Sequence, residues 1–366
     1  MTALVLKCHD VLTVSAPGLP GRLKQTLDVR LGHFSSAGPD SAQDPADIVL
    51  GPMADPPALP SFARHMNHMF GFAMVAYQGR PTVCLLRNGQ PEFCIFFLSH
   101  TRLAIHYRLA RGTENRFYGV LLFAVSLAMK LKGQLLAHGS VVVREGRAVV
   151  ISGHQGIGKT PLLLSLLRRG WQCLGDDKFF ITPGKVWMAE PHVAVSQYHF
   201  DGMPWLAGFL PGRPASPLPK ALARHLDRWA GMAWPSGLPV KIYRLLHPGM
   251  KIDLRNKPFS GRLAHQAVPV HWVILRRGAD FSVFTPDRED GLESLARVQS
   301  LFFSHRMALE KTLCLYNSVS VPSVKEILAQ NIPEPCFSLV AFSGEGDMDQ
   351  LCDLVEARAS ETCTEL

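Results

Sequence analysis

A glycine-rich segment in the middle of the chain constrains its fold more than any other feature. The segment matches the phosphate-loop pattern G-x-x-x-x-G-K-[ST] without a mismatch. An apolar run at 148–151 precedes it and predicts a strand, and a leucine-rich run at 160–169 predicts a helix that Gly170 ends. This order of strand, loop and helix predicts the α/β fold class. The residues of this glycine-rich loop are Gly153, His154, Gln155, Gly156, Ile157, Gly158, Lys159 and Thr160.

Each part of the loop pattern has a chemical reason. Glycines let backbone N–H groups approach a phosphate without a side-chain clash, and the N-terminus of the following helix adds positive potential. We expect Lys159 to neutralise the β- and γ-phosphates of ATP and the Thr160 hydroxyl to ligate Mg²⁺. Pro161 falls in the first helical turn, where its missing N–H has no intrahelical partner to lose. A chance match in a loop is the alternative, but the strand and helix on either side favour ATP and Mg²⁺ as cofactors.

Two adjacent carboxylates follow the glycine-rich loop at short range. Asp176 and Asp177 come directly after Gly175, at the end of a short predicted strand. A phosphoryl-transfer site needs one carboxylate for the metal and one group to accept the hydroxyl proton, and two neighbouring side chains can divide these roles. The alternative is an ordinary turn, because Gly-Asp-Asp is common turn chemistry. Because the pair follows a phosphate-loop pattern, we favour the functional interpretation.

A histidine stands on the other side of the loop in the sequence. His138 comes just before a predicted strand at 140–143, which should pair with the strand that leads into the loop. A lone histidine is more often structural than catalytic, and the chain has 15 histidines. The position of His138 alone therefore assigns it no role.

Composition excludes some classes of function. The chain has 366 residues, and a prior of about 150 residues per domain predicts two domains with a small appendage. The longest apolar candidate, 119–129, is far short of the roughly 20 residues that span a bilayer, and no signal peptide is visible at the start. The net charge is +8, but the Lys and Arg residues are scattered, which argues against nucleic-acid binding. None of the eight cysteines forms a C-x-x-C pair. We therefore expect reduced thiols in a cytoplasmic protein with no membrane or nucleic-acid partner, and leave self-association open.

The remaining pattern predicts how the chain is organised. Strands are expected at 72–77, 82–87, 92–98 and 102–107, a buried helix at 117–132, a hairpin at 178–188, a strand at 271–275, a helix at 292–311, and a strand and helix at 337–342 and 348–358. An amphipathic segment is expected at 220–230. The predicted domains are a small β-rich N-terminal domain at 1–115, a P-loop catalytic core at 116–320 and a C-terminal strand–helix appendage at 321–366.

The order of these features resembles the core of HPr kinase/phosphorylase. The resemblance spans 135–181: a His-Gly pair, a two-stranded hairpin, the glycine-rich loop, a helix ending in Arg-Arg-Gly, and Gly-Asp-Asp. It implies an α/β P-loop kinase core of the type shared with phosphoenolpyruvate carboxykinase. It also implies Asp176 as the proton acceptor for a substrate hydroxyl, Asp177 as a metal ligand with Thr160, and His138 beside the metal or the catalytic carboxylate. The roles of Asp176 and Asp177 could be exchanged.

The chain also departs from the enzymes that act on HPr. They carry Glu at the position of Pro161, and their signature region for phosphorolysis has no convincing counterpart here. Their N-terminal domain does not resemble 1–115. The chain is therefore more similar to the divergent HPr-kinase-related kinases, and neither HPr as substrate nor phosphorolysis is expected.

A further cation usually stabilises a transferring phosphoryl group. Lys251 is the first candidate, ahead of Arg255 and Lys241, although a solvated surface lysine is the alternative. The predicted function is transfer of the ATP γ-phosphate to a serine-type hydroxyl of a protein, peptide or small metabolite. A non-catalytic nucleotide-sensing module that binds a partner through 1–115 is the rival, and a carboxykinase-like lyase is a third alternative.

Overall fold

The computed structural model forms two compact units, each built from separate parts of the chain. The first unit comprises Met1–His138, Lys178–Glu190 and Asp287–Pro335, and the second comprises Gly139–Asp177, Pro191–Pro286 and Cys336–Leu366. Their bounds differ from those of the three predicted domains, whose division stays a prediction. The structure describes residues 4–9, 11–31, 35–36, 46–59, 64–66, 70–109, 113–154, 156–195, 199, 203–208, 250–255, 259, 261–332, 336–343 and 347–360.

The first unit is built around a mostly antiparallel sheet. Its strand order is β3-β1-β2-β4-β9-β8-β7-β6-β5, in which only the β2–β4 and β4–β9 pairs are parallel. Tight turns at residues 78–79 and 88–89 join β6 to β7 and β7 to β8, as the predicted meander requires. The strands are β1 (Leu4–Cys8), β2 (Leu12–Ala16), β3 (Ser35–Ser36), β4 (Ile48–Pro52), β5 (Arg64–Met66), β6 (Phe70–Tyr77), β7 (Arg80–Arg87), β8 (Gln90–Ser99) and β9 (Arg102–Tyr107).

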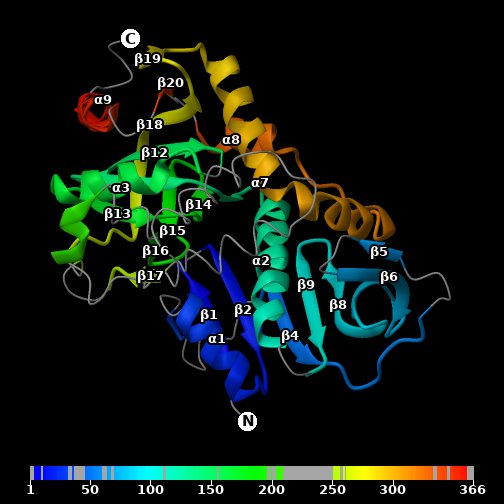
Figure 1. Ribbon diagram of the computed structural model, residues 1–366. Coiled ribbons are helices and arrows are strands. Elements are labelled where there is room, and N and C mark those ends of the chain that lie inside the picture. Colours follow the sequence, from blue (N-terminus) through cyan, green and yellow to red (C-terminus); the bar gives the residue numbers. More distant parts are fainter. Residues whose placement is uncertain are drawn as a thin grey trace, which may run out of the picture. The chain divides into compact units, whose positions relative to one another are not determined.

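Helix α2 (Thr113–Leu131) supplies much of the core of this unit. Figure 1 shows the helix beside β4 and β9. The helix is apolar on nearly every side, so it is buried against β4 and β9, and Gly133 with φ of +67° follows its end as predicted. A smaller three-stranded group, β10-β14-β15, also belongs to this unit, with a hairpin at Pro183-Gly184. The remaining elements are α1 (Gly21–Leu31), β10 (Leu135–Ala137), β14 (Phe179–Thr182), β15 (Lys185–Met188), α7 (Arg288–Tyr316) and α8 (Val324–Asn331).

The second unit is a mixed sheet with helices packed on it. Its described strands follow the order β19-β20-β18-β12-β11-β13, and a two-stranded ribbon, β16-β17, lies against α3. Helix α3 contacts β11, β12 and β13, and helix α9 contacts β12, β18 and α3. The elements are β11 (Ser140–Arg144), β12 (Arg147–Gly153), α3 (Lys159–Arg168), β13 (Gln172–Gly175), β16 (His192–Val195), η2 (Pro204–Gly208), β17 (Met250–Asp253), β18 (Gln266–Arg277), β19 (Ser282–Phe284), β20 (Phe337–Phe342) and α9 (Met348–Ser360).

The directions of the strands in the second unit determine at which edge of its sheet a ligand can bind. Strands β12, β18 and β20 run parallel to one another, and β11 pairs antiparallel with both β12 and β13. The carboxyl ends of β13, β12, β18 and β20 therefore meet at one edge of the sheet, where β11 also begins. In open α/β sheets, ligands bind outside the carboxyl ends of the strands.

The structure confirms a mixed α/β protein with several sheets, and the predicted helices and strands form within a few residues of their expected ends. The expected amphipathic segment at 220–230 lies outside the described residues. One expectation about cysteine was wrong: Cys336 is disulfide-bonded, whereas Cys84, Cys94, Cys173, Cys314 and Cys352 are free and buried. A disulfide depends on two sulfurs meeting in space, which spacing along the chain does not reveal. None of the described helices combines the length and the apolar character needed to cross a membrane.

Candidate functional site

The glycine-rich loop joins the carboxyl end of β12 to the N-terminus of α3. At Gly153, a Cβ atom would come within 2.9 Å of the Leu275 carbonyl oxygen on the neighbouring strand β18, so a side chain cannot fit there. At Gly158, φ is +112° and a Cβ would lie 3.3 Å from the Phe342 ring. Gly158 precedes α3, and no side chain caps the helix there. The first amides of α3 are therefore open to an anion at this end of the helix.

Lys159 is the first residue of α3, and its side chain folds back over the loop. Its ammonium donates to the carbonyl oxygens of Gly153 at 2.9 Å and His154 at 3.0 Å. Burial lowers the pKa of Lys159, and the negative charges of Asp176 and Asp177 oppose that shift. The ammonium is thus held among loop carbonyls at the position where the loop pattern needs a cation. Gln155, the remaining predicted loop contact, lies outside the described residues.

Asp176 follows β13 and is nearly fully buried. It accepts hydrogen bonds from the Ser140 hydroxyl at 2.7 Å and from the Thr160 hydroxyl, whose oxygen lies 3.1 and 3.2 Å from the two carboxylate oxygens. The Ala194 amide of β16 adds a longer bond of 3.4 Å. Burial raises the pKa of Asp176, while the hydrogen bonds from Ser140 and Thr160 lower it. The structure therefore brings together Asp176 and Thr160, two residues that the sequence analysis assigned to one site.

Asp177 adopts a strained backbone conformation beside this buried carboxylate. Its φ is +80°, in the left-handed region that residues with a side chain rarely adopt. It is less buried than Asp176, and its charge acts on both Asp176 and Lys159. Backbone strain of this kind clusters at functional sites, because surrounding structure must hold it in place. The chain bends at Asp176 and Asp177, and this bend carries a buried carboxylate bonded to Thr160.

The backbone of His138 is hydrogen-bonded to a glutamine that the sequence analysis did not single out. Its backbone N–H donates to the Gln299 side chain of α7 at 2.7 Å, and the Gln299 amide donates back to the His138 carbonyl at 2.8 Å. Both residues are buried and belong to the first unit, whereas the glycine-rich loop and Asp176 belong to the second. The expected role of His138 beside the metal or Asp176 therefore stays a prediction.

The candidate cations differ in their surroundings. Lys251 is exposed on β17, where it stands opposite Ala194, the residue whose amide contacts Asp176. Arg255 is paired with Asp253 through bonds of 2.5–3.0 Å, and this pairing lowers the pKa of Asp253. Lys241 lies outside the described residues. Of the two described cations, Lys251 is thus closer along the ribbon to Asp176.

Sequence reasoning missed Ser140, which makes the shortest hydrogen bond to Asp176. The register places Val141 of β11 beside Gly175 of β13, so the preceding Ser140 meets the residue that follows β13. A signal was present, because Ser140 comes two residues after His138 and begins a predicted strand. To use this signal, the reader of the sequence would have to know that β11 lies between β12 and β13.

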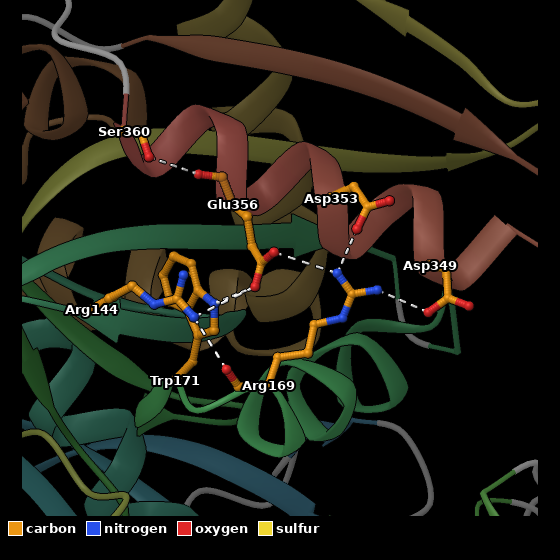
Figure 2. Close-up of polar contacts among 7 residues, drawn as sticks. All are labelled: Arg144, Arg169, Trp171, Asp349, Asp353, Glu356 and Ser360. Carbon is orange, nitrogen blue, oxygen red and sulfur yellow. Dashed lines mark hydrogen bonds and ion pairs between the residues drawn. The ribbon is translucent and has the colours of Figure 1, made fainter.

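The C-terminal helix fixes the far end of α3. Arg169, which follows α3, donates to Asp353 at 2.5 Å and to Asp349 at 2.9 Å on α9 (Figure 2). The indole N–H of the buried Trp171 donates to Glu356 of the same helix at 3.3 Å. Helix α9 belongs to the second unit, and it supports the helix that begins with Lys159 and Thr160.

Comparison with known proteins adds little to this geometry. No family model matches the chain, and no curated protein matches it. Among solved structures, the HPr(Ser) kinase/phosphatase from Coxiella burnetii is a weak neighbour, with 12% sequence identity and a TM-score of 0.27 over 61% of this chain and 94% of that chain. A TM-score this low carries no argument about function.

Proposed function

We propose that this protein is an ATP-dependent kinase that transfers the γ-phosphate to a hydroxyl group. The observation that carries the proposal is the contact between the Asp176 carboxylate and the Thr160 hydroxyl at the uncapped N-terminus of α3. A glycine-rich loop explains phosphate binding alone, but a buried carboxylate against its hydroxyl is what phosphoryl transfer additionally needs. The proposal includes a P-loop core of the HPr kinase type.

The proposed roles follow from the atoms that each residue presents. Amides at the start of α3 bind phosphate oxygens, and the Lys159 ammonium exchanges its two carbonyl partners for the β- and γ-phosphates. The acceptor oxygen forms a bond to the γ-phosphorus while the bond to the β–γ bridging oxygen breaks, so ADP leaves. Asp176 takes the hydroxyl proton. Lys251 is proposed to stabilise the charge that develops during transfer, and His138 is proposed to act beside the metal or the catalytic carboxylate.

A magnesium ion fits the oxygen atoms at this site. Mg²⁺ prefers carboxylate and hydroxyl oxygens together with phosphate oxygens, and Thr160 and Asp177 are the proposed protein ligands. When bound, it would neutralise charge on the β- and γ-phosphates. No cluster of three or more His, Cys, Asp or Glu side chains suited to a metal occurs within the described part of the chain. A magnesium ion that also binds phosphate oxygens does not need three protein side chains as ligands. The contact of Asp176 with Thr160 also fits the opposite assignment, in which Asp176 is the metal ligand and Asp177 accepts the proton.

The alternative function is a nucleotide-sensing module without catalysis. The adjacent carboxylates Asp176 and Asp177, together with His138, favour the kinase, because binding Mg²⁺–ATP needs one carboxylate for the metal, whereas transfer to a hydroxyl also needs a group that accepts its proton. The acceptor is proposed to be a serine-type hydroxyl on a protein, peptide or small metabolite. Phosphorolysis of the product is not expected, and a cytoplasmic location stays a prediction.

A direct transfer experiment tests the proposal. The full chain would be incubated with Mg²⁺ and γ-labelled ATP in three separate series, containing serine and threonine peptides, small alcohol metabolites, and a protein extract. We expect acid-stable label on a hydroxyl in at least one series, and none with Lys159→Ala. Tight Mg²⁺–ATP binding without labelled product in any series would instead support the sensing module.

A further inference from the structure

Arg277 stands beside the glycine-rich loop although it is far from it in the sequence. Strand β18 runs parallel to β12 with Leu275 opposite Gly153, so β18 continues two residues past the point where β12 passes into the loop. Arg276 and Arg277 end β18 there, and both are exposed. Successive residues of a strand point to opposite faces, so only one of the two can reach the loop.

The Arg277 guanidinium joins the loop to the end of β20. It donates to the Gly156 carbonyl oxygen at 3.3 Å and to the Ser343 carbonyl oxygen at 3.5 Å, and it lies 5.8 Å from the centre of the Phe342 ring. Phe342 itself packs against Gly158. Within the described part of the chain, no carboxylate forms an ion pair with Arg277.

The bond to Gly156 fixes one peptide group of the loop from both sides. The carbonyl oxygen of the Gly156–Ile157 peptide accepts from Arg277, and the N–H of the same peptide donates to the His154 carbonyl at 3.3 Å. A peptide group is planar, so holding both ends sets its orientation and limits the rotation of the amides on either side. Amides oriented in advance bind an anion more tightly, because less conformational freedom is lost on binding.

We propose that Arg277 is a positioning residue for nucleotide binding, which orients the glycine-rich loop through the Gly156–Ile157 peptide and adds positive charge beside the phosphates. This rests on the proposed ATP site. Arg276 is a matched control, because it has the same charge on the same strand and its side chain makes no hydrogen bond or ion pair with any described residue.

Calorimetric titration of Mg²⁺–ATP into four full-length proteins tests this role. We expect Arg277→Ala to weaken binding about tenfold, as the loss of a hydrogen bond from a charged group would. Arg276→Ala should stay within about twofold of the parent, and melting temperatures should not change. Arg277→Lys should fall between them, since an ammonium keeps the charge but lacks the planar fork that reaches two carbonyls.

Hydrogen exchange of the Ile157 and Gly158 amides without ATP provides a second readout. Arg277→Ala should speed their exchange, whereas Arg276→Ala should leave it unchanged. Equal ATP affinity in Arg277→Ala and the parent, or equal weakening by both alanine variants, would overturn the inference while leaving the kinase proposal intact. If the parent does not bind Mg²⁺–ATP, the proposed function fails, and amide exchange still decides whether Arg277 orients the loop. If Arg277→Ala does not fold, Arg277→Lys against Arg276→Ala carries the same comparison.

Discussion

Replacing Asp176 by asparagine separates the chemistry of this residue from its packing. Asparagine has nearly the same shape, and its one oxygen can still accept from both Ser140 and Thr160, but an NH₂ group replaces the other carboxylate oxygen, so the hydrogen bond from the Ala194 amide should be lost. A lost hydrogen bond of this kind costs about 0.5–1.5 kcal/mol. Removing a buried negative charge acts in the opposite direction. The free energy of unfolding should therefore change by less than about 1.5 kcal/mol.

The same substitution should affect transfer far more strongly. Asparagine cannot accept the hydroxyl proton, and proton transfer to a positioned base is typically worth ~10²–10⁴ in rate. We therefore expect Asp176→Asn to bind Mg²⁺–ATP about as well as the parent and to lose most transfer activity. Urea unfolding, calorimetric titration of Mg²⁺–ATP and the transfer rate would be measured on one preparation, with Asp177→Asn as the matched control.

The stability of the parent and that of Asp176→Asn should depend differently on pH. Burial raises the pKa of Asp176, so the folded protein holds this proton more tightly than the unfolded chain. Stability from this group is lost as pH rises from the ordinary value of 3.8 through the raised pKa of the folded protein. The stability of Asp176→Asn relative to the parent should accordingly rise over that range.

Three outcomes contradict parts of this reasoning. If nucleotide affinity collapses while the rate at saturating ATP persists, Asp176 is the metal ligand and the two carboxylates have exchanged roles. If neither affinity nor rate changes, Gly175-Asp176-Asp177 is only a turn. If the parent and Asp176→Asn show the same pH dependence of unfolding, the raised pKa is wrong.

Three further predictions concern other parts of the second unit. Lys159→Ala should fold normally and lose at least ~10²-fold in transfer, the scale for removing one charge-stabilising contact, and normal turnover would remove Lys159 from the site. His271 is buried with a pKa lowered to about 3, so the unfolded chain takes up its proton first. Stability should therefore fall by up to about 1.4 kcal/mol per unit as pH drops from 6.5 to 3, a dependence that His271→Gln should reduce in urea unfolding. Arg169→Ala removes largely exposed ion pairs and should cost less than about 1 kcal/mol. Glu356→Ala leaves the buried Trp171 N–H without its acceptor and should cost about 1–3 kcal/mol, so equal losses in the two variants would contradict this account.

Local sequence features were enough to predict most of the individual helices and strands. The strand–loop–helix around 153–160, the hairpin at Pro183-Gly184 and the end of α2 at Gly133 depend on backbone preferences within a few residues. The contact between Asp176 and Thr160 was also within reach, because the two residues are close in sequence and the resemblance placed them in one site. The catalytic roles assigned to them stay predictions.

Tertiary structure decided which distant residues surround the glycine-rich loop. Arg277 and Phe342 reach it because β18 pairs in parallel with β12 and β20 with β18. The Ala194 amide reaches Asp176 because β16 packs on α3. Parallel strands are joined by long connections, so their register is set by packing and by the entropy of closing those connections, neither of which leaves a local pattern. The sequence by itself determined where a phosphate-binding loop could form. The order of the strands determined which side chains stand at its edge, because only pairing across the sheet brings their carboxyl ends together.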